Sequence, residues 1–175
     1  RGFKKIFVSQ IWCYLEKAEE NLVFTKTRIF RISVSARKGT QKTNVAEACL
    51  KDNYGIIGDA HAGSWRQVSL LPYESYAAFL ASRSDISEIK PGDFAENITT
   101  IGLSFGQVKV GRKIRIGKEI ELEVTEIGKS ECHHGCHIRK TVGDCIMPRE
   151  GIFAKVIRGG KIQEGDIIAW GGDVL

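Results

Sequence analysis

The sequence predicts a mainly β fold, a β-barrel of mostly antiparallel strands with a few short helices. Short apolar segments with a period of two recur from residue 28 onward, which is the pattern of strands with one buried face. Glycines punctuate the later segments at 117–118, 159–160 and 165–166, where tight hairpin turns need a positive φ. Several short strands joined by such turns favour a closed or nearly closed barrel over a parallel α/β sheet.

Four segments are expected to form the strands: RIFRISVS at 28–35, QVSLL at 67–71, the stretch 113–127 and the stretch 151–170. In the third segment, Ile120, Leu122 and Val124 alternate with glutamates. This alternation predicts a strand with one buried and one solvent-exposed face.

Helical signals are fewer and begin at the N-terminal end. The apolar positions there recur at spacings of three or four: Phe3, Phe7, Ile11, Leu15, Ala18 and Leu22. We therefore expect a helical N-terminal extension over residues 1–27, followed by one β-barrel domain over residues 28–175. Within the body, helices are expected at 44–50, with Asn44 as N-cap, and at 72–83.

The positive charge of the chain is unevenly placed. The net charge is +5, but residues 1–43 carry ten Lys or Arg against three Glu, and the remaining residues carry sixteen against eighteen acidic residues. A nucleic-acid-binding domain concentrates its cations on the folded module, because phosphate contacts supply most of the affinity. The pattern favours a solubilising basic arm instead, and we expect no nucleic-acid partner.

The sequence also gives expectations about the compartment. No apolar run approaches the roughly 20 residues of a membrane-spanning helix, so no membrane association is expected. The basic and apolar start lacks a small-residue cleavage pattern, which argues against a signal peptide. The five cysteines are an odd number with three clustered, unlike the framework of a secreted disulfide-rich protein. We therefore expect a cytoplasmic protein.

The first candidate site is the segment GIIGDAHAGSWRQVSLL at residues 55–71. Its glycines predict a flexible loop that presents Asp59, His61 and Arg66 at the start of a strand. Such a loop can bind an anion, and Arg66 can give the bidentate contacts that phosphate favours. The alternative is a polar turn in which Asp59 caps its own backbone, and the local sequence leaves both open.

The second candidate site is the segment PGDFAENITTIGL at residues 91–103, which we expect to be a loop. It carries Glu96, Asn97, Thr99 and Thr100 before an apolar stop. The amide and the two hydroxyls can bind a polyol or an amide-bearing heterocycle. The commoner use of such side chains is to satisfy the backbone groups of the loop itself.

The third candidate site is KSECHHGCHIRKTVGDC, residues 129–145, with three of the five cysteines and three of the four histidines. A structural zinc site would draw its ligands from Cys132, Cys136, His137 and Cys145. Only one close pair is present, where such sites commonly have two. A covalent haem needs C-x-x-C-H, and a thioredoxin-like redox pair needs a two-residue spacing beside a βαβ unit; this segment has neither.

A single reactive thiol is a further interpretation of the same segment. Lys129, His133 and His134 can place positive charge near Cys132, which favours its thiolate. The remaining alternative is a loop of partly buried cysteines with surface histidines. Local sequence alone leaves these two about level.

Three blocks in this order, GIIGDAHAGSWRQVSLL, GDFAENITTIGL and ELEVTEIGKSEC, resemble the signature blocks of the MOSC domain, named for the C-terminal domain of molybdenum-cofactor sulfurases. The continuation CHIRKTVGDCIMPREGIFAKVIRGGKIQEGDII resembles a bacterial subgroup of small stand-alone MOSC proteins, some of whose relatives are fused to a molybdopterin-biosynthesis domain. The resemblance covers residues 28–168 and implies a barrel of mainly antiparallel strands.

The resemblance also implies a cysteine that carries sulfur as a persulfide or ligates molybdenum, in the loop after the strand ending EVT. That cysteine falls on Cys132, and the asparagine of the family's loop block falls on Asn97. Asp59 and Arg66 occupy motif positions that we expect to face the phosphate and pterin side of the cofactor.

This chain departs from the family pattern around the cysteine. Glu131 stands where a proline is more usual, and the loop is longer by one residue. Cys136 and His137 have no counterpart in the best-understood members, which keeps the zinc alternative open.

The resulting hypothesis is a MOSC protein that binds molybdenum cofactor or a pterin precursor, with Cys132 as the sulfur-bearing or metal-ligating residue. The candidate cofactor-binding residues are Asp59, His61, Arg66, Glu96, Asn97, Thr99 and Lys129. A first alternative is a molybdenum-dependent reductase of N-hydroxylated compounds, served by a separate electron-donor protein. A second is a non-enzymatic binding module stabilised by zinc. The sequence has no sign of a pyridoxal-phosphate enzyme, so a separate cysteine desulfurase would supply persulfide sulfur, and a molybdoenzyme is a candidate partner.

Overall fold

The computed structural model describes residues 26–171 except 84, 87 and 130–136. Its strands are β1 Arg28–Val34, β2 Thr43–Val45, β3 Glu47–Lys51, β4 Gly55–Ile56, β5 Val68–Pro72, β6 Ile98–Ile101, β7 Lys113–Ile116, β8 Ile120–Ile127, β9 Ile152–Arg158, β10 Gly160–Gln163 and β11 Ile168–Trp170. Its helices are α2 Tyr73–Ser82, the 3-10 turn η1 Phe105–Gln107, α3 His137–Val142 and α4 Met147–Glu150. No helix in the described part is long and apolar enough to cross a membrane.

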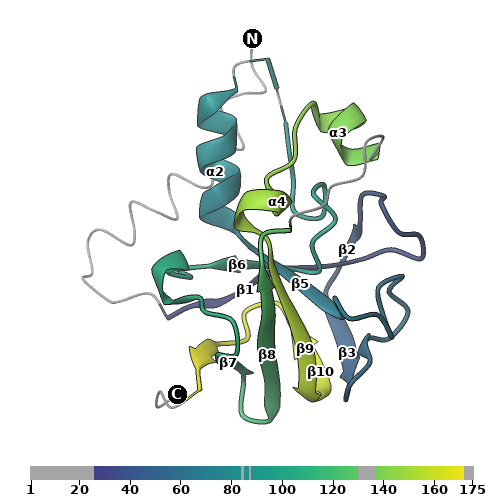
Figure 1. Cartoon of the computed structure of the whole chain (residues 1–175), viewed down its shortest axis with the longest axis vertical. Coiled ribbons are helices and arrows are strands. Elements are labelled where there is room, and N and C mark those ends of the chain that lie inside the picture. Colours follow the sequence, from purple (N-terminus) through teal and green to yellow (C-terminus); the bar gives the residue numbers. More distant parts are fainter. Residues whose placement is uncertain (1–25, 84, 87, 130–136, 172–175) are drawn as a thin grey trace.

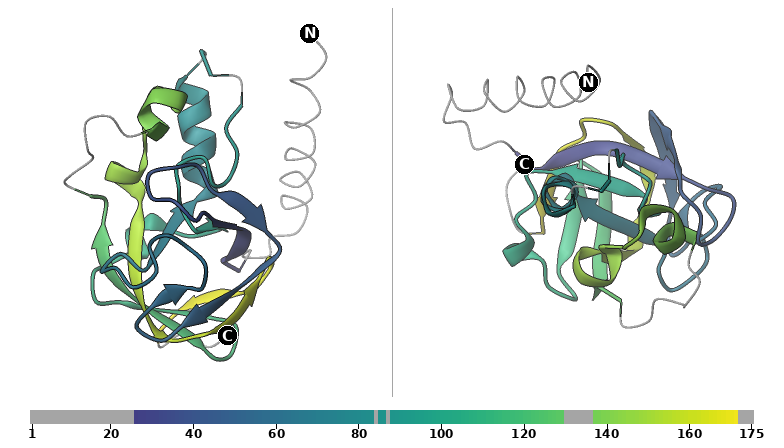
Figure 2. Two further views of the ribbon diagram at one scale, coloured as in Figure 1. Left: turned by 90° about the vertical axis from the view of Figure 1, so that its right-hand side faces the viewer. Right: turned by 90° about the horizontal axis from the view of Figure 1, so that it is seen from above.

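The strands form a curled barrel with a smaller attached sheet (Figures 1 and 2). The large sheet has the order β11-β7-β8-β9-β5-β6-β1-β2, and the small sheet has the order β10-β3-β4. Among the described pairings, β5 and β6 run parallel and the other pairs are antiparallel. The start of β1 reaches the opposite edge strand through a bridge between Arg28 and Ile167 and a bond from Ile168 N to Thr27 O of 2.7 Å. These contacts curl the large sheet toward closure, and the predicted mainly antiparallel barrel is confirmed.

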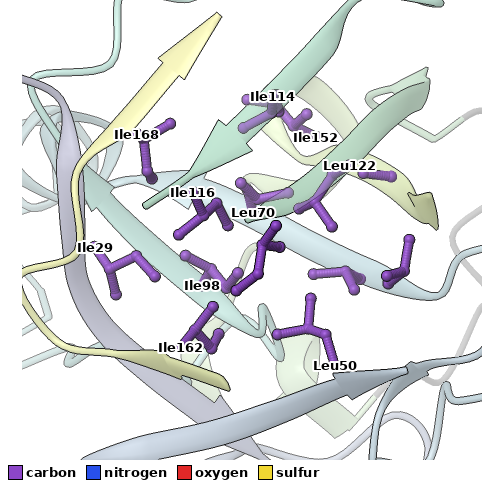
Figure 3. Close-up of a cluster of buried hydrophobic side chains, with 14 of the residues drawn as sticks. Ile29, Leu50, Leu70, Ile98, Ile114, Ile116, Leu122, Ile152, Ile162 and Ile168 are labelled. Carbon is purple, nitrogen blue, oxygen red and sulfur yellow. The ribbon is translucent and has the colours of Figure 1, made fainter. Parts of the chain in front are cut away.

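Aliphatic side chains from both sheets fill the interior of the barrel (Figure 3). Ile29, Leu70, Ile98 and Leu122 are almost fully buried there. Ile162 from β10 joins the same core, so the small sheet closes one side of it. The large buried apolar area supplies the main driving force for folding.

A second apolar cluster lies under the helices, at the upper end of the molecule in Figure 1. Tyr76 and Phe79 of α2 contact the ring of Phe94, with centroids 5.0 and 5.3 Å apart. Ile138 of α3 and Met147 of α4 belong to the same cluster. The cluster therefore ties the segment after residue 137 to the helix that follows β5.

Most strands form where the period-two pattern predicts them. The segments at 28–35, 67–71, 113–127 and 151–170 contain β1, β5, the pair β7 and β8, and the three last strands. The helix expected at 72–83 is α2. A helix is expected over residues 1–27. Of these, residues 1–25 lie outside the described part of the chain.

Three expectations about local structure are wrong. The segment 44–50 forms β2 and β3 in place of a helix, because β3 pairs with β10 across the chain and Asn44 Oδ1 accepts a bond from Ser33 Oγ of 2.7 Å. Residues 98–101 form β6, so Thr99 and Thr100 lie in a strand and not in a loop. The turns at 159–160 and 165–166 do not close hairpins, because β10 leaves the large sheet and joins β3. Each time, pairing between distant segments decides the outcome.

Candidate functional site

Within the predicted segment 55–71, the loop between β4 and β5 is held to the body by a buried ion pair. Lys42 Nζ donates to Asp59 Oδ2, and both side chains are fully buried. Asp59 also accepts bonds from Ser35 N at 3.1 Å and from His61 N at 2.9 Å. Asp59 therefore caps its own turn, which is one of the two alternatives that the sequence left open, and it also has an ion-pair partner 17 residues earlier in the chain.

Asp59 also orients His61. The ring Nδ1 of His61 lies 3.3 Å from Asp59 Oδ1, and the imidazole is 29% exposed. Burial alone would raise the pKa of Asp59, but the hydrogen bonds from His61 and Lys42, together with the charge of Lys42, outweigh it. The pKa of Asp59 is held well below its usual range. The carboxylate stays ionised, so it holds both the backbone of the loop and the Nδ1 atom of the His61 ring.

Arg66 is fixed by a bidentate ion pair. Its Nε and Nη2 donate to the two carboxylate oxygens of Glu126 at 2.6 and 2.8 Å. The guanidinium carbon also lies 4.3 Å from the ring centroid of Trp65 and 5.0 Å from that of Phe153. Glu126 is the last but one residue of β8. The loop is thus anchored where β8 ends, six residues before Cys132 in sequence.

Asn97 braces three strands. Its Oδ1 accepts bonds from Ser69 N and Ser69 Oγ at 3.1 and 3.0 Å, and its Nδ2 donates to Ser33 O at 3.2 Å. The residue is 1% exposed. These bonds link the residue just before β6 to β1 and β5. Asn97 thus satisfies backbone groups, which is one of the two uses that the sequence left open. Direct contact between Asn97 and a cofactor stays a prediction.

Glu96 and Thr99 form a buried cluster beside Asn97. Glu96 Oε1 accepts bonds from Tyr76 Oη at 2.5 Å, Thr99 Oγ1 at 2.7 Å and Gly92 N at 2.7 Å. Burial raises the pKa of Glu96, and these donors offset the rise only in part. Among the described residues, no partner reaches Glu96 Oε2. The predicted cofactor contacts of Glu96 and Thr99 also stay predictions.

The third predicted segment is described only at its two ends. Lys129 is half-buried, and its backbone N donates to Pro148 O at 3.1 Å. Cys145 is 3% exposed and belongs to the apolar cluster under the helices. His137 begins α3. Cys132, His133, His134 and Cys136 lie outside the described residues, so neither the reactive thiol nor the zinc alternative is tested by the geometry. No group of three metal-ligating side chains occurs among the residues that the structure does describe.

Three residues of this region were missed by the sequence interpretation. Lys42 and Glu126 take part through partners that are 17 and 60 residues away, so no local pattern points to them. Trp65 is 62% exposed and covers the guanidinium of Arg66. An exposed tryptophan next to an arginine in a glycine-rich loop was a local signal that could have been used.

Three side chains of these segments are accessible to solvent. Trp65 is exposed, the His61 imidazole is partly exposed, and Lys129, which follows β8, is half-buried. An aromatic ring and cationic donors are the kinds of group that bind an anionic heterocycle. Asp59 and Glu126 are each bonded to a cation of the protein.

The fold and the region around the end of β8 define a β-barrel domain with a polar and aromatic loop site. The family model described as the MOSC domain matches residues 57–169. Because this match spans more than half of the 175 residues, the chain belongs to the MOSC domain family, which is associated with the molybdenum cofactor. No curated protein is significantly similar to the chain in sequence.

Solved structures show the same fold at low sequence identity. The YUAD protein from Bacillus subtilis is 18% identical with a TM-score of 0.65, over 82% of this chain and 94% of that one. YiiM from Geobacillus stearothermophilus is 18% identical with a TM-score of 0.63, over 82% and 74% of the two chains. YiiM from Escherichia coli is 21% identical with a TM-score of 0.60, over 85% and 70%. At these identities the likeness concerns the fold.

Proposed function

We propose that this MOSC protein binds molybdenum cofactor or a pterin precursor, and that Cys132 carries sulfur as a persulfide or ligates molybdenum. The observation that carries the proposal is the Arg66–Glu126 ion pair. It brings the first signature block to the end of β8, from which the chain leads to Cys132. The family match over residues 57–169 supports the assignment to this cofactor class.

Each residue of the described region has a role in the proposal. His61 and Lys129 bind the anionic group of the ligand, and the Trp65 ring stacks on the flat heterocycle. Arg66 lies beside the Trp65 ring, and Glu126 keeps its guanidinium in place. Asp59, Glu96, Asn97 and Thr99 hold their segments in place through buried bonds within the protein, and their contact with the cofactor is part of the proposal.

The sulfur-carrying form of the proposal is a thiol exchange. The Cys132 thiolate attacks the outer sulfur of a donor persulfide, the sulfur–sulfur bond of the donor breaks, and the donor leaves as a thiolate. The outer sulfur keeps its proton, and Cys132 becomes a persulfide without a net oxidant or reductant. A cysteine desulfurase is the class of partner that supplies such a donor. The bound cofactor would supply the molybdenum centre to which the sulfur or the Cys132 thiolate binds.

The test is anaerobic purification followed by elemental analysis for molybdenum and zinc, with cyanide-releasable sulfur measured on the same sample. Cys132→Ala should lose both molybdenum and releasable sulfur. Cys49→Ala is the matched control, because it removes an exposed thiol from β3 and should lose neither. Cofactor and sulfur that survive in Cys132→Ala would remove the central claim.

Further measurements on the same purified protein distinguish the two alternatives. Holoprotein that reduces an N-hydroxylated base when given an electron donor would identify the reductase. Stoichiometric zinc, with unfolding on chelation, would identify the zinc-stabilised module built on Cys132, Cys136, His137 and Cys145. A cytoplasmic location belongs to the proposal in all three forms, because a free reactive thiol or thiolate ligand needs a reducing compartment.

A further inference from the structure

A cavity of about 460 Å³ lies at the end of the barrel where β7 and β8 form their hairpin. It is lined by four cations, Lys113, Arg115, Lys118 and Arg158, and by two carboxylates, Glu119 and Glu121. The formal net charge of the lining is therefore +2. Neither the sequence blocks nor the family match assigns a role to this group of residues.

The cavity is separate from the region around Arg66. Glu121 lines the cavity, whereas Glu126 binds Arg66, and the two residues are five positions apart on β8. At the rise of an extended strand this separation is roughly 17 Å. Figure 1 shows the hairpin of β7 and β8 at the opposite end of the strand from α4. A ligand of this cavity does not depend on the function proposed above.

The cations exceed what the local carboxylates can neutralise. Lys113 Nζ binds Glu121 Oε1 at 2.7 Å. Arg115 and Arg158 lie opposite Glu121 on the neighbouring strands. The hydrogen bond from Lys113, with the charges of Lys113, Arg158 and Arg115, lowers the pKa of Glu121.

Two guanidinium groups are left for a ligand. Within the described part of the chain, neither Arg115 nor Arg158 forms a side-chain hydrogen bond or a close ion pair. Lys155, further along the same face, is satisfied by Glu123 at 2.9 Å. The surplus of positive charge is therefore concentrated at the cavity and does not extend along the whole sheet face.

We propose that this cavity binds the phosphate group of a phosphorylated small molecule. Two guanidiniums on strands that flank β8 can bind one phosphate from two sides with bidentate hydrogen bonds. The volume exceeds that of a phosphate ion and lies in the range of small-molecule sites, so the ligand includes an organic part. Ile120 and Gly171 complete the lining of the cavity, next to which the organic part lies.

The proposal is tested by calorimetric titration with adenosine 5′-monophosphate, inorganic phosphate and adenosine, with amide NMR shifts to locate the site. The monophosphate and phosphate should bind and adenosine should not, with shifts at the amides of Gly117, Ile120 and Gly171. Arg115→Gln and Arg158→Gln should each raise the Kd about tenfold, because each removes a charged hydrogen bond. Added salt should weaken binding, since the groups are exposed.

Two further variants separate the proposal from general charge effects and from misfolding. Glu119→Gln removes a negative charge from the cavity and should lower the Kd by about two- to threefold, a gain that a damaged fold cannot produce. Lys155→Gln removes a positive charge outside the cavity and should leave the Kd unchanged within about twofold. Cys132→Ala should bind as the native chain does, so a failure of the cofactor proposal leaves this result intact.

Four results would overturn the proposal. One is adenosine binding as tightly as its monophosphate. Another is native affinity in both Arg115→Gln and Arg158→Gln. The third is a set of phosphate-induced shifts confined to residues 57–66. Absence of binding by all the probes at millimolar concentration would also reject it.

Discussion

Lys42 and Asp59 form an ion pair whose side chains are both fully buried. Removing two charges from water costs several kcal/mol, and only mutual attraction with further hydrogen bonds offsets that cost. Asp59 has those further bonds, from Ser35 N and His61 N. The pair therefore fixes the loop that carries His61 and Arg66, and its loss affects both stability and the candidate site.

Asp59→Asn should destabilise the fold by about 3–5 kcal/mol at pH 7, because it leaves Lys42 buried without its counter-charge. The pKa of Asp59 is lower in the folded than in the unfolded chain. Its contribution is therefore fully present above the unfolded pKa of about 3.9 and is lost as the pH falls below it. Urea unfolding of both proteins between pH 3 and pH 7 measures this.

The control for this prediction is the double variant Lys42→Met with Asp59→Asn, which removes both charges together and keeps an amide oxygen that can accept from the backbone of the loop. It should recover most of the lost stability, because no unpaired buried charge remains. Equal stability of Asp59→Asn and the native protein at pH 7 would show that the pair contributes nothing.

At the scale of elements, Gly128 sets the path of the chain directly after β8. This residue has a φ of +66°, and its N donates to Gly151 O at 2.6 Å. A Cβ at this position would clash with Pro148 O of α4. The close approach of the two backbones therefore requires glycine, and it fixes the direction in which the chain leaves β8 toward Cys132.

Gly128→Ala should destabilise the protein more than Gly117→Ala does. Both positions have positive φ, at +66° and +58°, but nothing lies within 4 Å of a Cβ at Gly117. The backbone cost of alanine in this conformation, about 1–2 kcal/mol, is common to both variants. The excess in Gly128→Ala measures the clash with α4, and chemical unfolding gives both values. Equal losses in the two variants would mean that α4 shifts without cost.

At the scale of the whole molecule, two apolar clusters divide the structure. One fills the barrel, and the other lies between α2, α3, α4 and the loop that contains Phe94. The strands β8 and β9 have hydrogen-bonded neighbours on both sides. Among the side chains of the short helix α3 that the structure describes, Ile138 and Val142 belong to the cluster under the helices, whereas Arg139 and Lys140 are exposed.

Hydrogen exchange should therefore separate the two parts. Amides of β8 and β9 should exchange only by global unfolding, while those of α3 should exchange at least about 100-fold faster through local opening. Mass spectrometry of peptides covering residues 120–127, 152–158 and 137–142 gives the comparison. Uniform protection across all three peptides would show that the helical cluster and the barrel open as one unit.

The sequence by itself determined the barrel class and most of its strands. The alternation at Ile120, Leu122 and Val124 and the glycine at 117 are local signals, because they act through side-chain period and backbone φ. The three ordered blocks determined the family in the same way, since they need only the chain order.

Only the tertiary structure decided which polar residues meet. Residues 44–50 form strands because they pair with β10. Asn97 links the two strands β5 and β1 through its bonds to Ser69 and Ser33. Asp59 pairs with Lys42, and Arg66 pairs with Glu126. These outcomes depend on contacts between segments that are distant in the chain, and such contacts are decided by the burial of the whole barrel and not by any local pattern.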